Sequence, residues 1–303
     1  MWGEEILNWT AGGEVCTFSP VIWMNPHLVT LTRWTKGGAL GLVADAVAVE
    51  EPLEIRVNGR SVAVTMRTPG HDRELAAGFL LTESVLTRGE ELLDLLVCKT
   101  QPDAASGNVV DAQVAASVAV DFARLTRHVF SASSCGLCGK ATVDAVFQSF
   151  PPVESAAQFS PEMMATLPEK LRAAQPGFGA TGGVHASALF GADGALRVLR
   201  EDVGRHNALD KVIGHALLAG ALPLHDVVLL VSGRVSFELV QKALAAGVPV
   251  IAGIGAPSSL AIECAQRGGQ TLVGFVRADR MNVYSGAERL GLGATRETVE
   301  VRP

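Results

Sequence analysis

The last third of the chain alternates short apolar segments with amphipathic ones, and this alternation constrains the fold more than any other feature. Strands are predicted at Val227–Val231, Val248–Ile254 and Thr271–Val276, where most residues are apolar. One helix is predicted between the first two strands, and another between the last two. Strands that alternate with helices pair in parallel through right-handed crossovers. The sequence therefore predicts an α/β fold here.

The loops that follow these strands meet at the carboxyl edge of the sheet, where such folds bind ligands. They carry the candidate binding residues Ser232, Gly233, Arg234, Phe275, Val276, Arg277, Ala278, Asp279 and Arg280, as well as the segment Gly255–Ser259. Helix N-termini, small residues and arginines at one edge suit a phosphate-bearing ligand. Ordinary turn chemistry with surface arginines explains the same spacing, so both interpretations stay open at this point.

The segment before these strands predicts two more strands and a helix. The strands are expected at Gly182–Leu189 and Ala195–Leu199, on either side of an Asp193-Gly194 turn. The helix is expected to begin at the N-cap Asn207, and an earlier helix is expected from Ala141. The resulting order of helix, strand, strand, helix, strand, helix, strand resembles the three-layer cytidine-deaminase-like fold.

The residues that perform zinc-dependent deamination are missing from this chain. Zinc deaminases carry His-x-Glu and Pro-Cys-x-x-Cys at the second and third helices of the fold. The matching places here read Arg205-His206-Asn207-Ala208 and Ser232-Gly233-Arg234-Val235. We therefore expect the fold without the deaminase activity.

The N-terminal half predicts a smaller α+β unit. Residues 51–67 are expected to form a β-hairpin, because Asn58-Gly59 supplies the positive φ of a tight turn. A helix from Asp72 to about Leu86, a loop over residues 100–112 and strands near Val114–Phe122 are expected to follow.

The whole chain is thus expected to be α+β in composition, with three parts. Residues 1–45 are predicted to form an irregular extension without an assigned role, and residues 46–125 a small α+β domain. Residues 126–303 are predicted to form a cytidine-deaminase-like domain with a Cys-x-x-Cys loop and the ligand pocket.

Cys135 and Cys138 lie in a Gly- and Ser-rich segment just before the helix predicted from Ala141. A helix N-terminus and Lys140 both favour the thiolate, which is the reactive form of cysteine. A structural zinc site needs further ligands, for which only isolated residues such as His185 and His206 are available. A thioredoxin-like redox site expects the pair inside a βαβ unit, which the element order does not provide. Sulfur, metal and redox chemistry therefore remain the alternatives, with zinc not favoured.

Composition excludes several other classes of protein. The chain has 303 residues, a formal net charge of −6 and 5 cysteines. The negative charge argues against a nucleic-acid partner, and no apolar run is long enough to span a membrane. The acidic start resembles no signal peptide, and the scattered cysteines form no disulfide framework. We expect a cytoplasmic protein.

Several motifs, in order from about residue 50 to about residue 285, resemble those of the FdhD/NarQ family. They are Thr68-Pro69-Gly70, Gly78-Phe79-Leu80-Leu81-Thr82-Glu83, Cys135-Gly136-Leu137-Cys138-Gly139, Gly182-Gly183-Val184-His185-Ala186, Glu201-Asp202-Val203-Gly204-Arg205-His206-Asn207-Ala208, Ser232-Gly233-Arg234 and Phe275–Tyr284. Members of this family are sulfur carriers needed for formate dehydrogenase activity. Any one of these motifs is weak, whereas the ordered set is specific.

The resemblance implies a sulfurtransferase that uses a cysteine persulfide. A cysteine desulfurase would supply the sulfur, and the client would be the bis-(guanine dinucleotide) molybdenum or tungsten cofactor of apo-formate dehydrogenase. Cys135 would carry the persulfide with Cys138 as its partner, and Phe275–Arg280 would bind the guanine nucleotide portion. Asp202, Arg205 and His206 are further candidate pocket residues, and a homodimer is expected. No permanently bound metal is expected. A non-catalytic cofactor chaperone and a zinc or redox module remain alternatives.

The sequence leaves several questions open. It does not distinguish molybdenum from tungsten or indicate which dehydrogenase is served. It does not indicate whether both cysteines are required.

Overall fold

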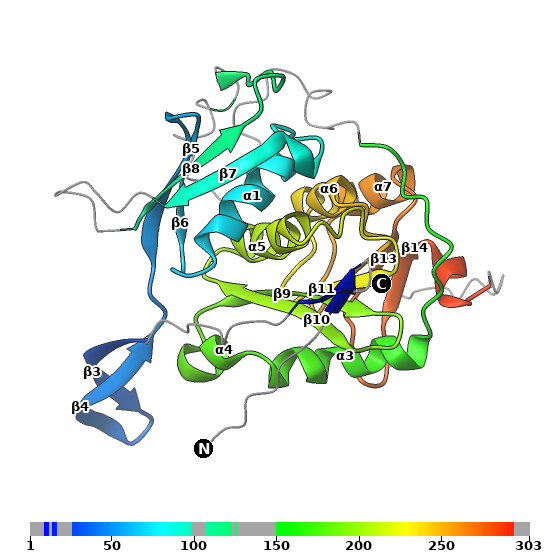
Figure 1. Cartoon of the computed structure of the whole chain (residues 1–303). Helices are drawn as coiled ribbons and strands as arrows, with labels where there is room; N and C mark the ends of the chain where they lie inside the picture. The colour runs from blue at the N-terminus through cyan, green and yellow to red at the C-terminus, as the bar shows by residue number, and fades with distance from the viewer. Residues whose placement is uncertain are drawn as a thin grey trace.

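The computed structural model describes residues 9–11, 14–16, 26–97, 107–122, 125 and 150–293. Cys135, Cys138 and the helix predicted from Ala141 lie outside these residues. The mixed α/β fold is confirmed, and its frame is a six-stranded sheet beside a four-stranded one (Figure 1).

The larger sheet contains the strands predicted in the last third and in the segment before it. Its members are β9 (His185–Gly191), β10 (Leu196–Asp202), β11 (Val227–Val231), β12 (Val250–Gly253), β13 (Thr271–Gly274) and β14 (Asn282–Ser285). Their order in the sheet is β10-β9-β11-β12-β13-β14. As predicted, β11, β12 and β13 run parallel, whereas the outer strands pair antiparallel. This element order agrees with the expected cytidine-deaminase-like arrangement.

Helices cover both faces of this sheet and give three layers (Figure 1). One face carries α5 (Arg205–Leu218), α6 (Phe237–Ala245) and α7 (Ser259–Arg267), and the other carries α3 (Pro161–Ala173), which α4 (Pro176–Thr181) follows. Side chains alternate between the two faces along a strand. Leu229 and Val231 therefore pack in the cluster with α5 and α6, and Val228 and Leu230 pack in the cluster with α3.

The start of α5 differs from the sequence-based expectation. Its N-cap is Gly204, and Asn207 lies inside the first turn. The Asn207 amide instead donates to the Met66 carbonyl oxygen at 2.8 Å and to the Asp202 carboxylate at 3.0 Å. A residue that suits an N-cap is used here for a long-range contact between the two sheets.

The smaller sheet has the order β6-β5-β8-β7 and packs against α1 (Asp72–Thr82). Its strands are β5 (Glu51–Val57), β6 (Arg60–Arg67), β7 (Leu92–Val97) and β8 (Val109–Val114), with a short 3-10 helix η1 (Gly89–Glu91) before β7. The predicted hairpin is confirmed, with φ of 48° at Asn58 and 79° at Gly59.

Several predictions for this region were wrong. The helix ends at Thr82 rather than Leu86. β8 begins inside the predicted loop, because Val110, Ala112 and Val114 alternate with polar residues and are buried. β7 was not predicted, and residues 115–122 contain none of the expected strands.

The predicted irregular extension is corrected over residues 27–47, which form an antiparallel ribbon of β3 (His27–Thr35) and β4 (Gly38–Val47). The ribbon stands apart from the body, and Leu28, Trp34 and Leu42 are exposed (Figure 1). β1 (Trp9–Ala11) pairs with β2 (Glu14–Cys16). A 3-10 helix, η3 (Ala287–Leu290), follows β14. Among the described residues, no helix combines the length and apolar composition needed to cross a membrane.

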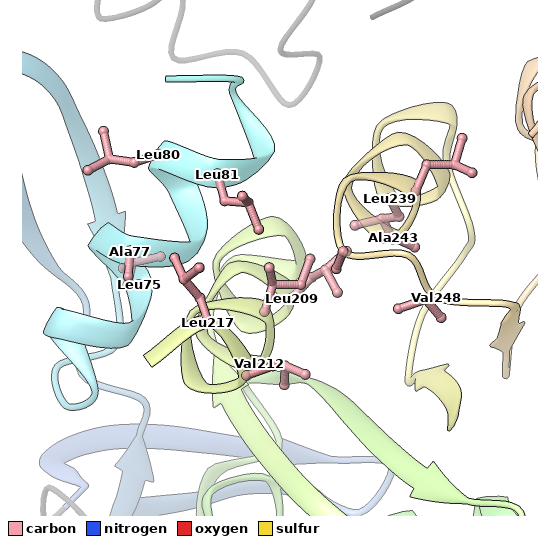
Figure 2. Close-up of a cluster of buried hydrophobic side chains, with 14 of the residues drawn as sticks. Leu75, Ala77, Leu80, Leu81, Leu209, Val212, Leu217, Leu239, Ala243 and Val248 are labelled. Atoms are coloured by element: carbon pink, nitrogen blue, oxygen red, sulfur yellow. The ribbon is translucent and has the colours of Figure 1, made fainter. Parts of the chain in front are cut away.

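The two sheets are joined by the crossing of α1 and α5, which we call the helix seam. A Cβ atom at Gly214 would lie 1.8 Å from the Glu74 carbonyl oxygen, and one at Gly78 would lie 1.8 Å from that of Asp210. Only glycine fits such an approach of two backbones. Apolar side chains from α1, α5 and α6 form one continuous core around this crossing (Figure 2).

Two clusters of charged side chains, mostly shielded from solvent, also lie at the helix seam. Lys242 of α6 contacts Asp210 at 3.0 Å and Glu83 at 3.2 Å, and it donates to the Thr82 hydroxyl at 2.8 Å. Burial opposes its charge, but the Asp210 and Glu83 carboxylates raise the pKa of Lys242.

The second cluster is centred on Glu74. Arg200 donates to both Glu74 carboxylate oxygens, at 2.5 and 2.7 Å, and His215 lies 3.0 Å from one of them. Burial works to raise the pKa of Glu74, but these contacts and a further one from His71 outweigh it and hold that pKa far below its usual range.

Candidate functional site

The loops after β11, β12 and β13 interlock at the carboxyl edge of the larger sheet, as predicted. The Gly255 amide donates to the Gly233 carbonyl at 3.0 Å, and the Val235 amide donates to that of Ala256 at 3.0 Å. The Phe275 amide then donates to the Gly255 carbonyl at 3.1 Å. These bonds bring the segments 232–234, 255–259 and 275–280 into one structure.

Gly255 allows the loops to approach this closely. A Cβ atom there would lie 3.0 Å from both the Arg234 amide nitrogen and the Gly233 carbonyl oxygen. Ser232 has a structural contact, because its hydroxyl accepts a hydrogen bond from the Ala186 amide at 2.9 Å. Of the three residues in the Ser-Gly-Arg motif, Arg234 alone carries an exposed side chain.

A cavity of about 540 Å³ opens between the first turns of α5, α6 and α7. It is lined by Arg205, Arg234, Val235, Ser236, Phe237, Glu238, Ala256, Pro257, Ser258 and Leu260. Helix N-termini carry partial positive charge, so their convergence here adds to that of the two arginines. The Ser258 hydroxyl caps α7 by accepting from the Ala261 amide at 3.2 Å. This cavity suits an anionic ligand.

The segment from Phe275 to Arg280 forms a tight turn beside this edge. Phe275 has a positive φ of 52° and is 41 % exposed, so its ring is available at the surface. The Arg277 guanidinium donates to the carbonyls of Ile254 at 2.8 Å and Val276 at 2.7 Å, which fixes the turn. The other predicted residues of the turn divide by exposure. Val276 is buried, whereas Ala278, Asp279 and Arg280 are exposed, with an ion pair of 3.5 Å between the last two.

Asp202 stabilises the backbone next to the site. Its carboxylate is fully buried, 2.7 Å from the Lys211 ammonium group, and accepts from the amides of Thr68 at 3.1 Å and Gly204 at 2.8 Å. It does not line the cavity. It holds the chain segment from which Arg205 and His206 start α5, and so it acts on the site through the backbone.

His206 contacts a carboxylate that the sequence analysis missed. Its Nε2 lies 2.7 Å from the Glu238 Oε2 atom, between α5 and α6. No spacing or motif pointed to Glu238, since it lies in the first turn of a different helix. A single acidic residue within a helix carries no local signal of a partner that is 32 positions away.

His185 lies close enough to Arg205 to feel its charge. Burial, followed by the positive charge of Arg205, lowers its pKa, and the negative charge of Asp202 partly opposes them. A Cβ atom at Gly233 would lie 3.5 Å from His185 Nδ1, so the imidazole packs beside the Ser-Gly-Arg loop. His185 is therefore part of the wall of this edge.

The described residues place no group of three or more His, Cys, Asp or Glu side chains where a metal ion could be held. Cys264 is a buried thiol, and burial raises its pKa to about 11, so it is poorly suited to act as a nucleophile. The predicted reactive residues Cys135 and Cys138 lie outside the described residues.

The comparisons with known proteins agree on one family. Residues 48–291 match the model of the FdhD/NarQ family. The chain is 51% identical over 268 residues to a Streptomyces avermitilis protein named "Sulfur carrier protein FdhD", covering 86% of this chain and 94% of that protein. A Mycobacterium tuberculosis protein of the same name is 51% identical over 253 residues, covering 81% and 92%.

A solved structure is also similar. It is the crystal structure of a Desulfotalea psychrophila protein described as a candidate formate dehydrogenase accessory protein. The TM-score is 0.70 at 26% sequence identity, and the match covers 88% of this chain and 100% of that one.

Proposed function

This chain belongs to the FdhD/NarQ family, and on that premise we propose that it is a sulfur carrier required for formate dehydrogenase activity. The names of its relatives support sulfur transfer, and the similar Desulfotalea psychrophila structure supports the formate dehydrogenase link. The observation that carries the rest of the proposal is the cavity with its two arginines and three helix N-termini beside the Phe275 turn.

We propose Cys135 as the persulfide carrier and a cysteine desulfurase as the donor. The Cys135 thiolate attacks the terminal sulfur of the persulfide on the desulfurase. A new S–S bond forms at Cys135 while the S–S bond of the donor breaks, and the desulfurase cysteine leaves as a thiolate. The exchange needs no oxidant or reductant. Cys138 is the proposed partner, which either relays the sulfur or resolves a disulfide.

The substrate of the second transfer is proposed to be the bis-(guanine dinucleotide) molybdenum or tungsten cofactor. Arg205 and Arg234 would bind its phosphates together with the helix N-termini, and the exposed Phe275 ring would stack on a guanine. A homodimer in the cytoplasm, acting on apo-formate dehydrogenase, completes the proposal.

Intact-protein mass spectrometry tests the carrier step. The full chain is incubated with a cysteine desulfurase and cysteine, as wild type, Cys135→Ala and Cys138→Ala. We expect a mass gain of one sulfur atom that reductant removes and that Cys135→Ala lacks. Loss of the gain in Cys138→Ala alone would exchange the roles of the two cysteines. A wild-type protein that takes up no sulfur and retains zinc would refute the proposal in favour of a metal module.

A second measurement separates carrying sulfur from binding the cofactor. Cys135→Ala is expected to bind GDP as the wild type does, yet to leave formate dehydrogenase inactive in cells. An active dehydrogenase in these cells would support the non-catalytic chaperone instead. Phe275→Ala should retain the persulfide and bind GDP about tenfold more weakly, because one base-stacking contact is lost.

A further inference from the structure

Two serines occupy equivalent places in the loops that form the cavity. Ser236 is the N-cap of α6 and Ser258 is the N-cap of α7, and the residues just before them, Val235 and Pro257, form a parallel bridge. The backbones of the two serines are also alike, with φ and ψ of −87° and 165° at Ser236 and of −85° and 160° at Ser258. Both residues line the cavity. Serine at an N-cap normally accepts from an amide of the first turn, so the same contact is expected of both hydroxyls.

The two hydroxyls are nevertheless used differently. The Ser258 hydroxyl accepts from the Ala261 amide at 3.2 Å, which is the usual N-cap contact. The Ser236 hydroxyl makes no such contact with Leu239, the equivalent residue of α6. Its oxygen is buried, and no group in the described part of the chain forms a hydrogen bond with it. Buried polar atoms without a partner are rare in folded proteins, so one in the wall of a ligand cavity indicates a contact that a ligand completes.

We propose that Ser236 is a binding residue of this cavity and that its hydroxyl donates a hydrogen bond to a phosphate oxygen of the ligand. Rotation about the Cα–Cβ bond moves the oxygen between staggered positions, so the hydroxyl turns from the wall toward the ligand without a change in the backbone. The inference rests on the proposed function only for the nucleotide part of the ligand. The contact itself requires only a phosphate group.

The surroundings of Ser236 suit a phosphate oxygen. Arg205 and Arg234 line the same cavity, and the serine stands at the N-terminus of α6, which carries partial positive charge. Glu238 also lines the cavity and offsets part of this positive charge. The attraction between charges depends little on direction, whereas a hydrogen bond weakens steeply when it is misaligned. Ser236 therefore fixes the orientation of a phosphate that the arginines attract.

A structural role for the hydroxyl predicts a different outcome. If Ser236 capped α6 as Ser258 caps α7, its replacement by alanine would lower the stability of the protein. A hydroxyl that caps nothing and binds the ligand predicts the reverse. Ser236→Ala should then unfold at the same denaturant concentration as the wild type and bind the ligand more weakly.

Calorimetric titration of the full-length protein with GDP and with pyrophosphate, beside chemical denaturation, tests this contact. Ser236→Ala should bind both about tenfold more weakly, because a hydrogen bond to a charged group is lost. The matched control is Ser160→Ala on the opposite face of the larger sheet, where the hydroxyl caps α3 by accepting from the Met163 amide at 3.0 Å. It should lower the denaturation midpoint and leave GDP binding unchanged. A loss of stability in Ser236→Ala as large as in this control overturns the proposal.

The salt dependence of binding separates the hydrogen bond from the general field of the cavity. The loss of GDP affinity in Arg234→Ala should shrink at high salt, because dissolved ions screen the charge of a guanidinium group. The loss in Ser236→Ala should keep its size, since the hydroxyl is neutral. A Ser236→Ala loss that shrinks in parallel with that of Arg234→Ala would contradict the direct contact.

The outcomes distinguish this contact from the proposed function. If the wild type binds GDP and Ser236→Ala binds it equally well, the serine contact is refuted and the nucleotide site stands. If the wild type binds pyrophosphate alone and Ser236→Ala weakens that binding, the phosphate contact stands and the guanine nucleotide is refuted. If the wild type binds neither, both are refuted, and the persulfide measurement still decides the carrier step.

Discussion

The carboxyl edge and the helix seam both gather charged side chains and glycines, but they use them in opposite ways. At the helix seam, Lys242 is buried and Arg200 is partly buried, and both are directly paired with carboxylates. At the carboxyl edge, Arg205 and Arg234 line an open cavity. Gly78 and Gly214 bring two helices together, whereas Gly255 brings three loops together around a space. Charge that is neutralised between side chains within the protein maintains the fold, whereas charge placed on the lining of a cavity can act on a ligand there.

The strongest disruption of the helix seam should come from Lys242→Met. The change leaves Asp210 buried without its cation, which costs about 4 kcal/mol of unfolding free energy. Chemical denaturation measures the loss. Adding Asp210→Asn should recover a large part of it, because the uncompensated charge is then gone. Equal losses in the single and double variants would show that the ion pair is not the origin of the effect.

Gly214→Ala should be the next largest effect. The new Cβ atom would lie 1.8 Å from the Glu74 carbonyl oxygen, so α1 and α5 must separate, at a cost of about 3 kcal/mol. Denaturant unfolding provides the measurement. The control is Gly179→Ala in α4, where no atom lies within 4 Å of the added carbon, and it should leave stability unchanged or slightly higher. A Gly214→Ala protein as stable as that control would contradict the close approach.

Glu74→Gln should flatten the acid limb of the stability curve. The folded-state pKa of Glu74 lies far below its usual value of 4.5, so its ionised form adds stability that is fully present above pH 4.5. That stability is lost as pH falls below this value, by about 2 kcal/mol between pH 6 and pH 3. Denaturation curves at several pH values should therefore show a smaller acid loss in Glu74→Gln than in wild type. Parallel curves would refute this assignment.

Arg234→Ala should have the smallest effect on stability, within about 0.5 kcal/mol, because its side chain is exposed. GDP affinity should nevertheless fall, which calorimetry measures. Arg267→Ala on α7 is the matched surface control, and it should change neither quantity. A large loss of stability in Arg234→Ala would remove the distinction between the two regions.

The sequence predicted the carboxyl edge much better than the helix seam. The apolar runs of β11, β12 and β13 reveal parallel strands, and parallel topology places the loops that follow them at one edge. The helix seam depends on contacts between residues far apart in the chain. Gly78 and Gly214 each read as ordinary helical glycines, and nothing local shows that their backbones meet.

The remaining misses have similar physical causes. The ribbon over residues 27–47 lacks a strong apolar alternation, because little of it is buried by the body. Glu238 was missed because its partner His206 lies on another helix. Asp202 was expected near the ligand, and its position behind the site follows from long-range contacts with Thr68 and Lys211.

The shared core around the α1–α5 crossing determines how the chain would behave if it were split into two fragments. Segments from the first and second halves of the chain fill the same apolar interior, so neither half can be exchanged for that of a distant relative without repacking both. Two fragments produced by cutting the chain between residues 125 and 150 would instead be expected to find each other and assemble. The chain is therefore suited to fragment complementation, in which two separate fragments restore the folded protein.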